Sequence, residues 1–355
     1  MSAPANTLTS ILKLLLRLQL ISWSLYTALA RVLIWNAVFA KRNFSAYYLP
    51  RNESSHDEMK QPMQCQMGVD QVMESKTGHR ISYRCYGDPE GKPVFYFHGW
   101  PGSRHEGQLF SDLAKENNCL LVAPERPGYG RSSAVGHLSL RSWALLMGEL
   151  SDHLGLPAFS VMGLSGGGPH ACAVMSCLSS KVDRGALLVP MGPMNAREGV
   201  LRMHPLQRLM AEITPLAPWF PKTLMAMVRP LLRRTPGLTL WAMRRFLLPD
   251  CDQKALSGKE LQPIFQKTMA ESLIYGTSGM YGDGLRFLEP WQHTLDAVSC
   301  PVKIWHGFAD TIVPIEFGMY VASRIKDSEG EWLEQEGHFS VPMAHAQACF
   351  KFLTQ

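Results

Sequence analysis

The chain has 355 residues, 46% of them hydrophobic and 18% charged, which allows a large folded core, and no stretch is of low complexity. Its formal charge of +5 comes from residues 1–51, where six basic side chains stand without an acid and leave the rest at about −1. A near-neutral body has no bulk attraction for nucleic acid, so we expect no nucleic-acid partner.

Residues 1–42 form a hydrophobic segment that is predicted to associate with a membrane. Residues 8–40 are mostly apolar, and after Arg17 the only charge among them is Arg31, which suits a transmembrane helix. Placing the charged Arg31 near the middle of a transmembrane helix would cost about 3 kcal/mol of insertion free energy. Alternatively, Arg17, Ser24 and Arg31 recur every seven residues and share one face of an interfacial helix. Both alternatives predict an intracellular, membrane-associated protein. A helix packed on its own domain is the third possibility.

The polar stretch 43–66 has no clear period and is predicted to be a linker. Two N-glycosylation triplets begin at Asn43 and Asn52, but such triplets are common and leave the side of the membrane open. The eight cysteines are scattered without a C-x-x-C pair. This pattern argues against a zinc site, indicates no disulfide framework, and favours buried free thiols.

Strand-like and helix-like segments alternate in the body of the chain. Strands are expected at 80–86, 93–98, 119–124, 159–164, 184–190, 300–306 and 330–334, and helices at 104–117, 138–154, 166–180, 315–326 and 341–354. The alternation predicts an α/β fold, with helices on both faces of a mostly parallel sheet formed by residues 67–190 and 296–355. Functional residues of such sheets follow the carboxyl ends of the strands.

Residues 191–295 interrupt this alternation. They are rich in methionine, tryptophan and paired arginines, contain no convincing strand, and carry prolines that favour short helices. We interpret them as a helical cap inserted into the core. Their apolar composition predicts a roof over an apolar pocket, although ordinary packing within the cap would explain many of the same residues.

A serine between a predicted strand and a predicted helix is the candidate nucleophile. Gly163-Leu164-Ser165-Gly166-Gly167 has the pattern G-x-S-x-G, in which Gly163 and Gly167 give clearance to a serine on a sharp turn. The amino end of the following helix favours a developing negative charge. The pattern alone is common, but its placement predicts that Ser165 is a nucleophile.

A serine nucleophile needs a base, and the base needs an acid that orients it. Asp310 follows the strand 300–306, and His338 follows the strand 330–334, in the order serine, acid, histidine. We therefore predict Asp310 as the acid and His338 as the base. Weaker alternatives are His170, His306 and His345 for the base, and Asp283 and Asp296 for the acid.

A glycine-rich turn after the second predicted strand is the candidate oxyanion loop. The backbone amides of Trp100 and Gly166 are predicted to hold the oxyanion. Pro101 fixes the turn and is expected to follow a cis peptide bond. His98 and Gly99 are expected to support this loop, with His98 bracing it and not acting as a base.

Five segments carry a family resemblance: HGWPGSR at 98–104, ERPGYGRSS at 125–133, GLSGGG at 163–168, HGFAD at 306–310 and EGHFS at 336–340. In this order they resemble the α/β-hydrolase superfamily, and most closely its capped serine hydrolases similar to proline iminopeptidases and esterases. The resemblance covers residues 70–355 and implies the triad Ser165, Asp310 and His338, with oxyanion amides at Trp100 and Gly166. Glu125 stands where the family more often has Asp. A serine nucleophile argues against dehalogenase and epoxide hydrolase chemistry.

Residues and resemblance together predict a serine hydrolase that cleaves a lipophilic carboxylic ester through an acyl-enzyme on Ser165. The expected partner is a small, apolar acyl substrate, and no metal or organic cofactor is needed. One alternative is an iminopeptidase-like amide hydrolase, in which Glu212, Glu260 or Glu271 of the cap would hold the substrate amine. Another is a ligand-binding protein that uses the same fold without turnover.

Overall fold

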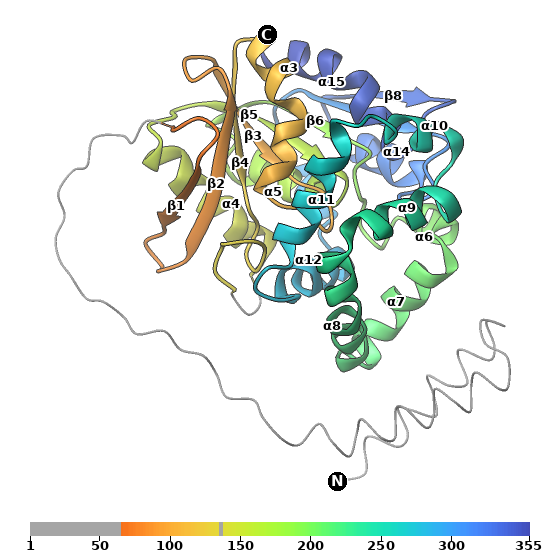
Figure 1. The fold of residues 1–355 in the computed structure, drawn as a ribbon. Coiled ribbons are helices and arrows are strands. Elements are labelled where there is room, and N and C mark those ends of the chain that lie inside the picture. Colours follow the sequence, from red (N-terminus) through yellow and green to blue (C-terminus); the bar gives the residue numbers. More distant parts are fainter. Residues whose placement is uncertain (1–64, 135–137) are drawn as a thin grey trace, which may run out of the picture. The chain divides into compact units, whose positions relative to one another are not determined.

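The computed structural model describes residues 65–134 and 138–355, which build an eight-stranded sheet (Figure 1). The strands are β1 (Asp70–Glu74), β2 (Arg80–Gly87), β3 (Lys92–Phe97), β4 (Cys119–Pro124), β5 (Phe159–Leu164), β6 (Val182–Leu188), β7 (Val302–Gly307) and β8 (Ser328–Leu333). Their order is β1-β2-β4-β3-β5-β6-β7-β8. The pairs β1–β2 and β2–β4 are antiparallel and the others parallel, which confirms the predicted mostly parallel sheet.

The first strand, β1, is the one that the sequence pattern did not predict. The other seven begin and end within two residues of their predicted positions. In β1 the inward-facing positions are Gln71 and Met73, whereas Val72 between them is exposed. The strand therefore lacks a clean alternation of apolar inward and polar outward residues, which is the signal for a half-buried strand.

Helices cover both faces of the sheet, and each face has its own hydrophobic core. The core helices are η1 (Arg104–Phe110), α3 (Ser111–Glu116), α4 (Leu140–His153), η2 (Ser165–Gly167), α5 (Gly168–Cys177), α14 (Ile315–Arg324) and α15 (Ser340–Leu353). Side chains of α4, α5 and α14 join one core, and those of α3 and α15 join the other. On β3, Phe95 and Phe97 belong to the first core and Val94 and Tyr96 to the second. This alternation is that of a strand buried on both faces.

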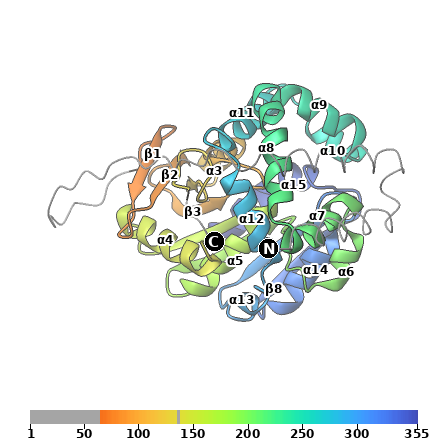
Figure 2. The ribbon, with the colours of Figure 1, turned by 90° about the horizontal axis from the view of Figure 1, so that it is seen from below.

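Between β6 and β7 the chain forms helices and no strand. They are α6 (Arg197–Arg202), α7 (Pro205–Leu216), α8 (Trp219–Arg234), α9 (Pro236–Phe246), α10 (Asp250–Ala255), α11 (Leu261–Ser272), α12 (Ser278–Leu288) and α13 (His293–Asp296). Figure 2 shows α8, α9 and α11 next to one another, and contacts join all three. Pro236 begins a helix as expected, but Pro215 and Pro230 lie inside α7 and α8. The boundaries of residues 191–295 as a separate cap stay a prediction.

The predicted membrane segment 1–42 and nearly all of the predicted linker 43–66 lie outside the described residues. Across residues 65–134 and 138–355, no helix is both long enough and apolar enough to cross a membrane.

One pair of cysteines corrects the sequence-based expectation of free thiols. Cys65 and Cys85 form a disulfide, with their Cα atoms 6.2 Å apart. The pair forms because the segment before β1 lies against β2, where the Gly68 N–H donates to the Cys85 carbonyl over 2.9 Å. Spacing along the chain could not reveal a contact that the sheet creates. The free and buried thiols of the described residues are Cys119, Cys172, Cys300 and Cys349.

Candidate active site

Ser165 lies buried on the turn that joins β5 to α5, with φ of +52°. This left-handed conformation is strained for a residue other than glycine, and such strain is frequent at functional sites. The neighbouring glycines are required by packing. An ideal Cβ on Gly167 would lie 2.1 Å from the Phe97 carbonyl oxygen, and one on Gly163 would lie 2.8 Å from the Ala171 Cβ. The turn is therefore wedged between β3 and α5, and neither glycine position has room for a side chain. Their supporting role in catalysis stays a prediction.

The structure brings the predicted acid and the predicted base together. Asp310 follows β7, His338 follows β8, and 2.7 Å separates Asp310 Oδ2 from His338 Nδ1. The other carboxylate oxygen, Oδ1, accepts hydrogen bonds from the backbone N–H groups of Ile312 and Val313, each at 2.8 Å. The carboxylate is thus fixed on one side by its own loop and holds the imidazole on the other.

The groups around this pair lower the pKa of Asp310 and raise the pKa of His338. Burial would raise the pKa of Asp310, but the charge of His338 and hydrogen bonds from His306 and His338 outweigh it and hold the pKa below its usual range. Burial would lower the pKa of His338, but the charge and hydrogen bond of Asp310 raise it above its usual value. The carboxylates of Asp252 and Glu106 raise it further. His338 therefore binds a proton more readily than free imidazole does.

The loop after β3 lies against the turn of Ser165. Its Trp100–Pro101 peptide bond is cis, as predicted. An ideal Cβ on Gly166 would lie 2.7 Å from the Trp100 Cβ and 3.5 Å from the Trp100 nitrogen, and one on Gly99 would lie 3.9 Å from the Ser165 Cβ. The two candidate oxyanion amides thus belong to adjoining segments beside the serine, and their role as an oxyanion hole stays a prediction.

Glu106 supports this loop and escaped the sequence-based prediction. It is buried in η1, and its Oε2 accepts the Gly99 N–H over 3.0 Å. Burial raises the pKa of Glu106 to about 7, against the opposing effect of the Gly99 hydrogen bond. A glutamate within the predicted helix 104–117 is expected to be exposed to solvent. The sequence therefore offered no signal that this carboxyl group lies in the site.

Arg126 also holds the loop after β3 in place. Its guanidinium donates to the carbonyl oxygens of His98 and Gly99, the second over 2.9 Å. The same group donates from Nε to Asp283 Oδ2 over 2.9 Å, and both side chains are fully buried. His98 is buried too, and burial holds its pKa well below the usual value. These contacts suit the supporting role predicted for His98 and Gly99.

Asp283 and His170, the weaker candidates for the acid and the base, lie in the same buried group of contacts as Arg126. Asp283, on α12, also pairs with Arg286 over 3.0 Å and approaches His170 Nε2 at 3.4 Å. His170 Nδ1 lies 3.1 Å from the Gly166 carbonyl oxygen, so the ring is buried under the turn and does not line a pocket. His170 therefore packs beneath the turn, and Asp283 pairs with Arg126.

Asp252, on α10 of the insertion, holds the loop that carries His338. Its Oδ2 accepts the His338 N–H over 2.9 Å, and its Oδ1 accepts those of Phe339 and Ser340 over 2.8 and 2.9 Å. The residue is 0% exposed, and an ideal Cβ on Gly337 would lie 2.6 Å from its carboxylate. No local motif could indicate this residue, because its partners lie more than eighty positions further along the chain.

The other alternative residues have different partners. His306 Nε2 lies 2.9 Å from the Val313 carbonyl oxygen and 3.3 Å from Asp310 Oδ2, so it supports the loop of the acid. The remaining two make contacts at the surface: His345 with Glu331, and Asp296 with Arg324.

An apolar cavity of about 340 Å³ lies beside Ser165 and Gly166. Its walls come from α7, α8 and α12 of the insertion and from the loops after β6 and β7. None of its lining residues is charged, and six are methionines: Met191, Met194, Met203, Met210, Met225 and Met280. Methionine side chains are flexible and adapt to irregular apolar shapes. The cavity can therefore take an apolar group next to the serine.

The cap acids considered for an amine-binding role lie elsewhere. None of Glu212, Glu260 and Glu271 lines the apolar cavity. Glu212 pairs with Arg208 on α7, Glu271 contacts Arg104 over 3.3 Å, and Glu260 is exposed.

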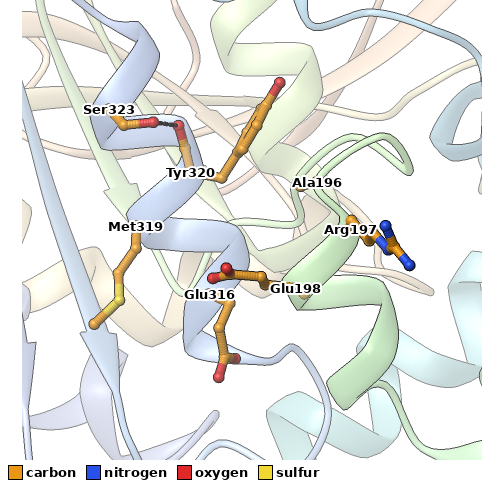
Figure 3. A pocket seen from close by; sticks show the side chains of 8 residues that line it. Ala196, Arg197, Glu198, Glu316, Met319, Tyr320 and Ser323 are labelled. Carbon is orange, nitrogen blue, oxygen red and sulfur yellow. Dashed lines mark hydrogen bonds between the residues drawn. The ribbon is translucent and has the colours of Figure 1, made fainter.

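A second, more polar cleft of about 410 Å³ lies between α6 and α14 (Figure 3). Arg197, Glu198, Glu316 and Tyr320 are among its lining residues, which include none of the predicted site residues and none that lines the apolar cavity. Ser165 therefore lines the apolar cavity and not the polar cleft.

Comparisons with known proteins match most of the chain. The Alpha/beta hydrolase family matches residues 94–352. A proline iminopeptidase of Clostridium botulinum is 31% identical over 102 residues, which is 28% of this chain and 34% of that protein. The match thus spans about a third of this curated relative.

Solved structures share the fold. An alpha/beta hydrolase fold protein from Nakamurella multipartita superimposes with a TM-score of 0.56 at 20% identity, covering 81% of this chain and 99% of that one. An esterase from Exiguobacterium antarcticum has a TM-score of 0.58 at 18% identity, covering 80% and 98%. At these identities the likeness concerns the fold alone, since one fold hosts many activities.

Proposed function

We propose that this chain, which belongs to the Alpha/beta hydrolase family, is a serine hydrolase that cleaves a lipophilic carboxylic ester. The proposal rests above all on one arrangement: a strained serine at the end of β5 opens onto an apolar cavity, and an Asp310–His338 pair follows β7 and β8, two adjacent strands that run parallel to β5 in the same sheet. Carboxyl ends of neighbouring parallel strands meet at one edge of the sheet, where such sites form.

In the proposed reaction, Ser165 Oγ attacks the ester carbonyl carbon while His338 accepts the hydroxyl proton. Asp310 orients His338 and stabilises its charged form, and the Trp100 and Gly166 amides donate to the oxyanion. Collapse breaks the carbon–oxygen bond, and the alcohol leaves with the proton from His338. Water then attacks the acyl carbon while His338 accepts its proton. The bond between the acyl carbon and Ser165 Oγ breaks, His338 returns the proton to Oγ, and the carboxylic acid leaves.

The lining of the cavity favours an apolar acyl or alcohol group. An iminopeptidase must bind a substrate amine, and an amine in a cavity without a charged side chain would be left without a counter-charge. The partial match to a proline iminopeptidase keeps amide hydrolysis as the second candidate. Comparing p-nitrophenyl esters with aminoacyl arylamides separates them, because faster turnover of the arylamides would favour the second.

Labelling with a serine-reactive fluorophosphonate tests the mechanism. The folded full-length chain should be labelled at Ser165, and Ser165→Ala should abolish labelling and lower ester turnover by about a thousandfold or more. Ser160→Ala is a matched control, because Ser160 is a buried serine on β5, the strand before Ser165, and its hydroxyl donates to the Leu353 carbonyl. A folded chain that resists labelling at Ser165 would exclude the acyl-enzyme. Tight ligand binding without turnover, unchanged in Ser165→Ala, would favour the ligand-binding alternative.

The predicted membrane association through residues 8–40 remains part of the proposal. Alkaline carbonate extraction of membranes that contain the full chain distinguishes its two forms. A transmembrane helix stays in the pellet, whereas an interfacial helix is released. A chain that is recovered in the soluble fraction before extraction would contradict both.

A further inference from the structure

Helices α8 and α9 of the insertion expose large apolar side chains at helical spacing. The exposed set is Leu224, Met227 and Leu231 on α8, and Leu238, Trp241 and Phe246 on α9. Met227 and Phe246 are 68% and 69% exposed, although residues of these types are normally buried. On each helix the side chains follow one another mainly at intervals of three or four residues and share a face. The two helices contact each other (Figure 2). We call this set the apolar face.

The same two helices are strongly basic. Residues 219–246 contain six basic residues and no acidic one: Lys222, Arg229, Arg233, Arg234, Arg244 and Arg245. Arg229 and Arg244 donate to backbone carbonyl groups of the insertion. The other four are exposed, and among residues 65–134 and 138–355 no carboxylate lies within ion-pairing distance of them. Their positive charge is therefore not neutralised by the described part of the chain.

The apolar face is continuous with the cavity beside Ser165. Leu224 on α8 lines this cavity and is also 38% exposed, and Leu206 on α7 lines it and is 55% exposed. The apolar wall of the cavity thus reaches the surface next to the basic and apolar side chains of α8. An apolar molecule could enter there without leaving an apolar environment.

We propose that the α8–α9 face docks on a lipid bilayer with anionic headgroups. Apolar side chains on such a surface enter the boundary of headgroups and acyl chains, while long basic side chains reach the phosphates. A second copy of the chain would bring the same positive charge against itself, and residues 1–51 of the chain carry six basic residues and no acid. Like charge thus disfavours both as occupants. The docking requires no chemistry at Ser165, so it stands independently of the proposed reaction.

Hydrogen–deuterium exchange on the full-length chain tests the docking locally, whatever the amino-terminal segment does. Exchange of peptides from residues 219–247 is compared without lipid, with phosphatidylcholine vesicles, and with phosphatidylcholine vesicles containing one quarter phosphatidylserine. We expect exchange of these peptides to slow at least about fivefold on the anionic vesicles, with little change on the neutral ones. Peptides of α3 and α14 should exchange at the same rate in all three samples.

Two variants and their matched controls identify the side chains that make the contact. Arg233→Gln with Arg234→Gln removes two exposed charges, and Met227→Glu with Leu231→Glu places charges on the apolar face. Both should abolish the slowing on anionic vesicles. The controls make equal changes at exposed positions elsewhere: Lys115→Gln with Lys326→Gln, and Val69→Glu with Leu145→Glu. Both controls should keep the slowing of exchange on anionic vesicles. Fluorophosphonate labelling or thermal melting confirms that each variant is folded.

Three results would overturn the docking. The first is unchanged exchange of residues 219–247 on anionic vesicles. The second is equal slowing on neutral vesicles, which would remove the role of the basic residues. The third is slow exchange of residues 219–247 already in the absence of lipid. If this protection grows with protein concentration, a second copy covers the face. If it does not, residues 1–51 of the same chain cover it.

Discussion

His338 lies among three acidic side chains that come from different parts of the chain. Asp310 contacts its ring, Asp252 accepts its backbone N–H, and the charge of Glu106 also raises its pKa. Only Asp310 stands at a strand end in a recognisable motif, so only Asp310 was predicted. Because the base must be neutral to accept a proton, a raised pKa places the acidic limb of the rate profile above the usual value near pH 6.5.

The variant Asp252→Asn should move this limb to lower pH. Removing a negative charge favours neutral imidazole, so the pKa of His338 falls and activity persists into more acidic solution. The plateau of kcat/KM should also fall, by about tenfold, because an amide nitrogen replaces one of the oxygens that hold the His338 loop. The measurement is kcat/KM for a soluble p-nitrophenyl ester as a function of pH.

Asp250→Asn is the matched control for this variant. Asp250 lies on the same helix, α10, but is exposed. Its substitution should therefore leave both the acidic limb and the plateau of the kcat/KM profile unchanged. A lower plateau in Asp252→Asn with an unmoved limb would mean that Asp252 only holds the fold of the loop.

Among the elements, the loop after β3 and the helix α12 are joined by buried charges. Arg126 links the carbonyl groups of this loop to Asp283 on α12. Asp283 also pairs with Arg286 on the same helix and approaches His170 on α5. Buried ions of this kind are tolerated only when they are paired. Helix α12 of the insertion and the loop after β3 are therefore positioned by one shared set of contacts.

Asp283→Ala should lower the free energy of unfolding by about 3–5 kcal/mol, because it leaves two buried guanidinium groups without their partner. Asp296→Ala breaks an exposed pair with Arg324 and should leave the free energy of unfolding close to that of the parent chain. Chemical denaturation of both variants measures the difference. Equal and small losses would mean that the Asp283 pairs are hydrated and contribute little.

At the scale of the whole described body, the cavity depends on segments that are far apart in the sequence. The turn after β5 supplies Ser165, the insertion supplies α7, α8 and α12, and the loop after β7 closes the wall with Ile312 and Val313. The size of the cavity is therefore a property of the assembled core and insertion. It should set the length of the acyl group that can be cleaved.

Gly284→Leu should shorten this length. Gly284 lines the cavity, and an ideal Cβ on it meets nothing within 4 Å, so a side chain at this position begins in open space. We expect turnover of a p-nitrophenyl acetate to stay within about twofold of the parent. Turnover of long-chain esters should fall by about ten- to hundredfold, as one or more methylenes lose their space.

Gly284→Ala serves as the control and should cause a much smaller shift. Equal losses with acetate and with long-chain esters would contradict a role of this cavity in binding the acyl group.

The sheet was predictable to the extent that its strands have simple patterns. Runs such as 119–124 and 159–164 are apolar and β-prone because both faces are buried, and their bounds match the structure. The strand β1 was missed because its inward positions include Gln71. Strand-end motifs also predicted that Asp310 and His338 would meet, since neighbouring parallel strands end at one edge.

By itself, the sequence determined the α/β alternation, the strained serine turn and the order of serine, acid and histidine, because these depend on neighbours a few residues apart. Only the tertiary structure decided that Asp252 and Glu106 are buried beside His338, that Asp283 pairs with Arg126, and that Cys65 meets Cys85. The sequence does not distinguish a charged residue that is solvated from one that is buried. Its environment is set by segments tens to more than a hundred residues away, which only the folded chain brings together.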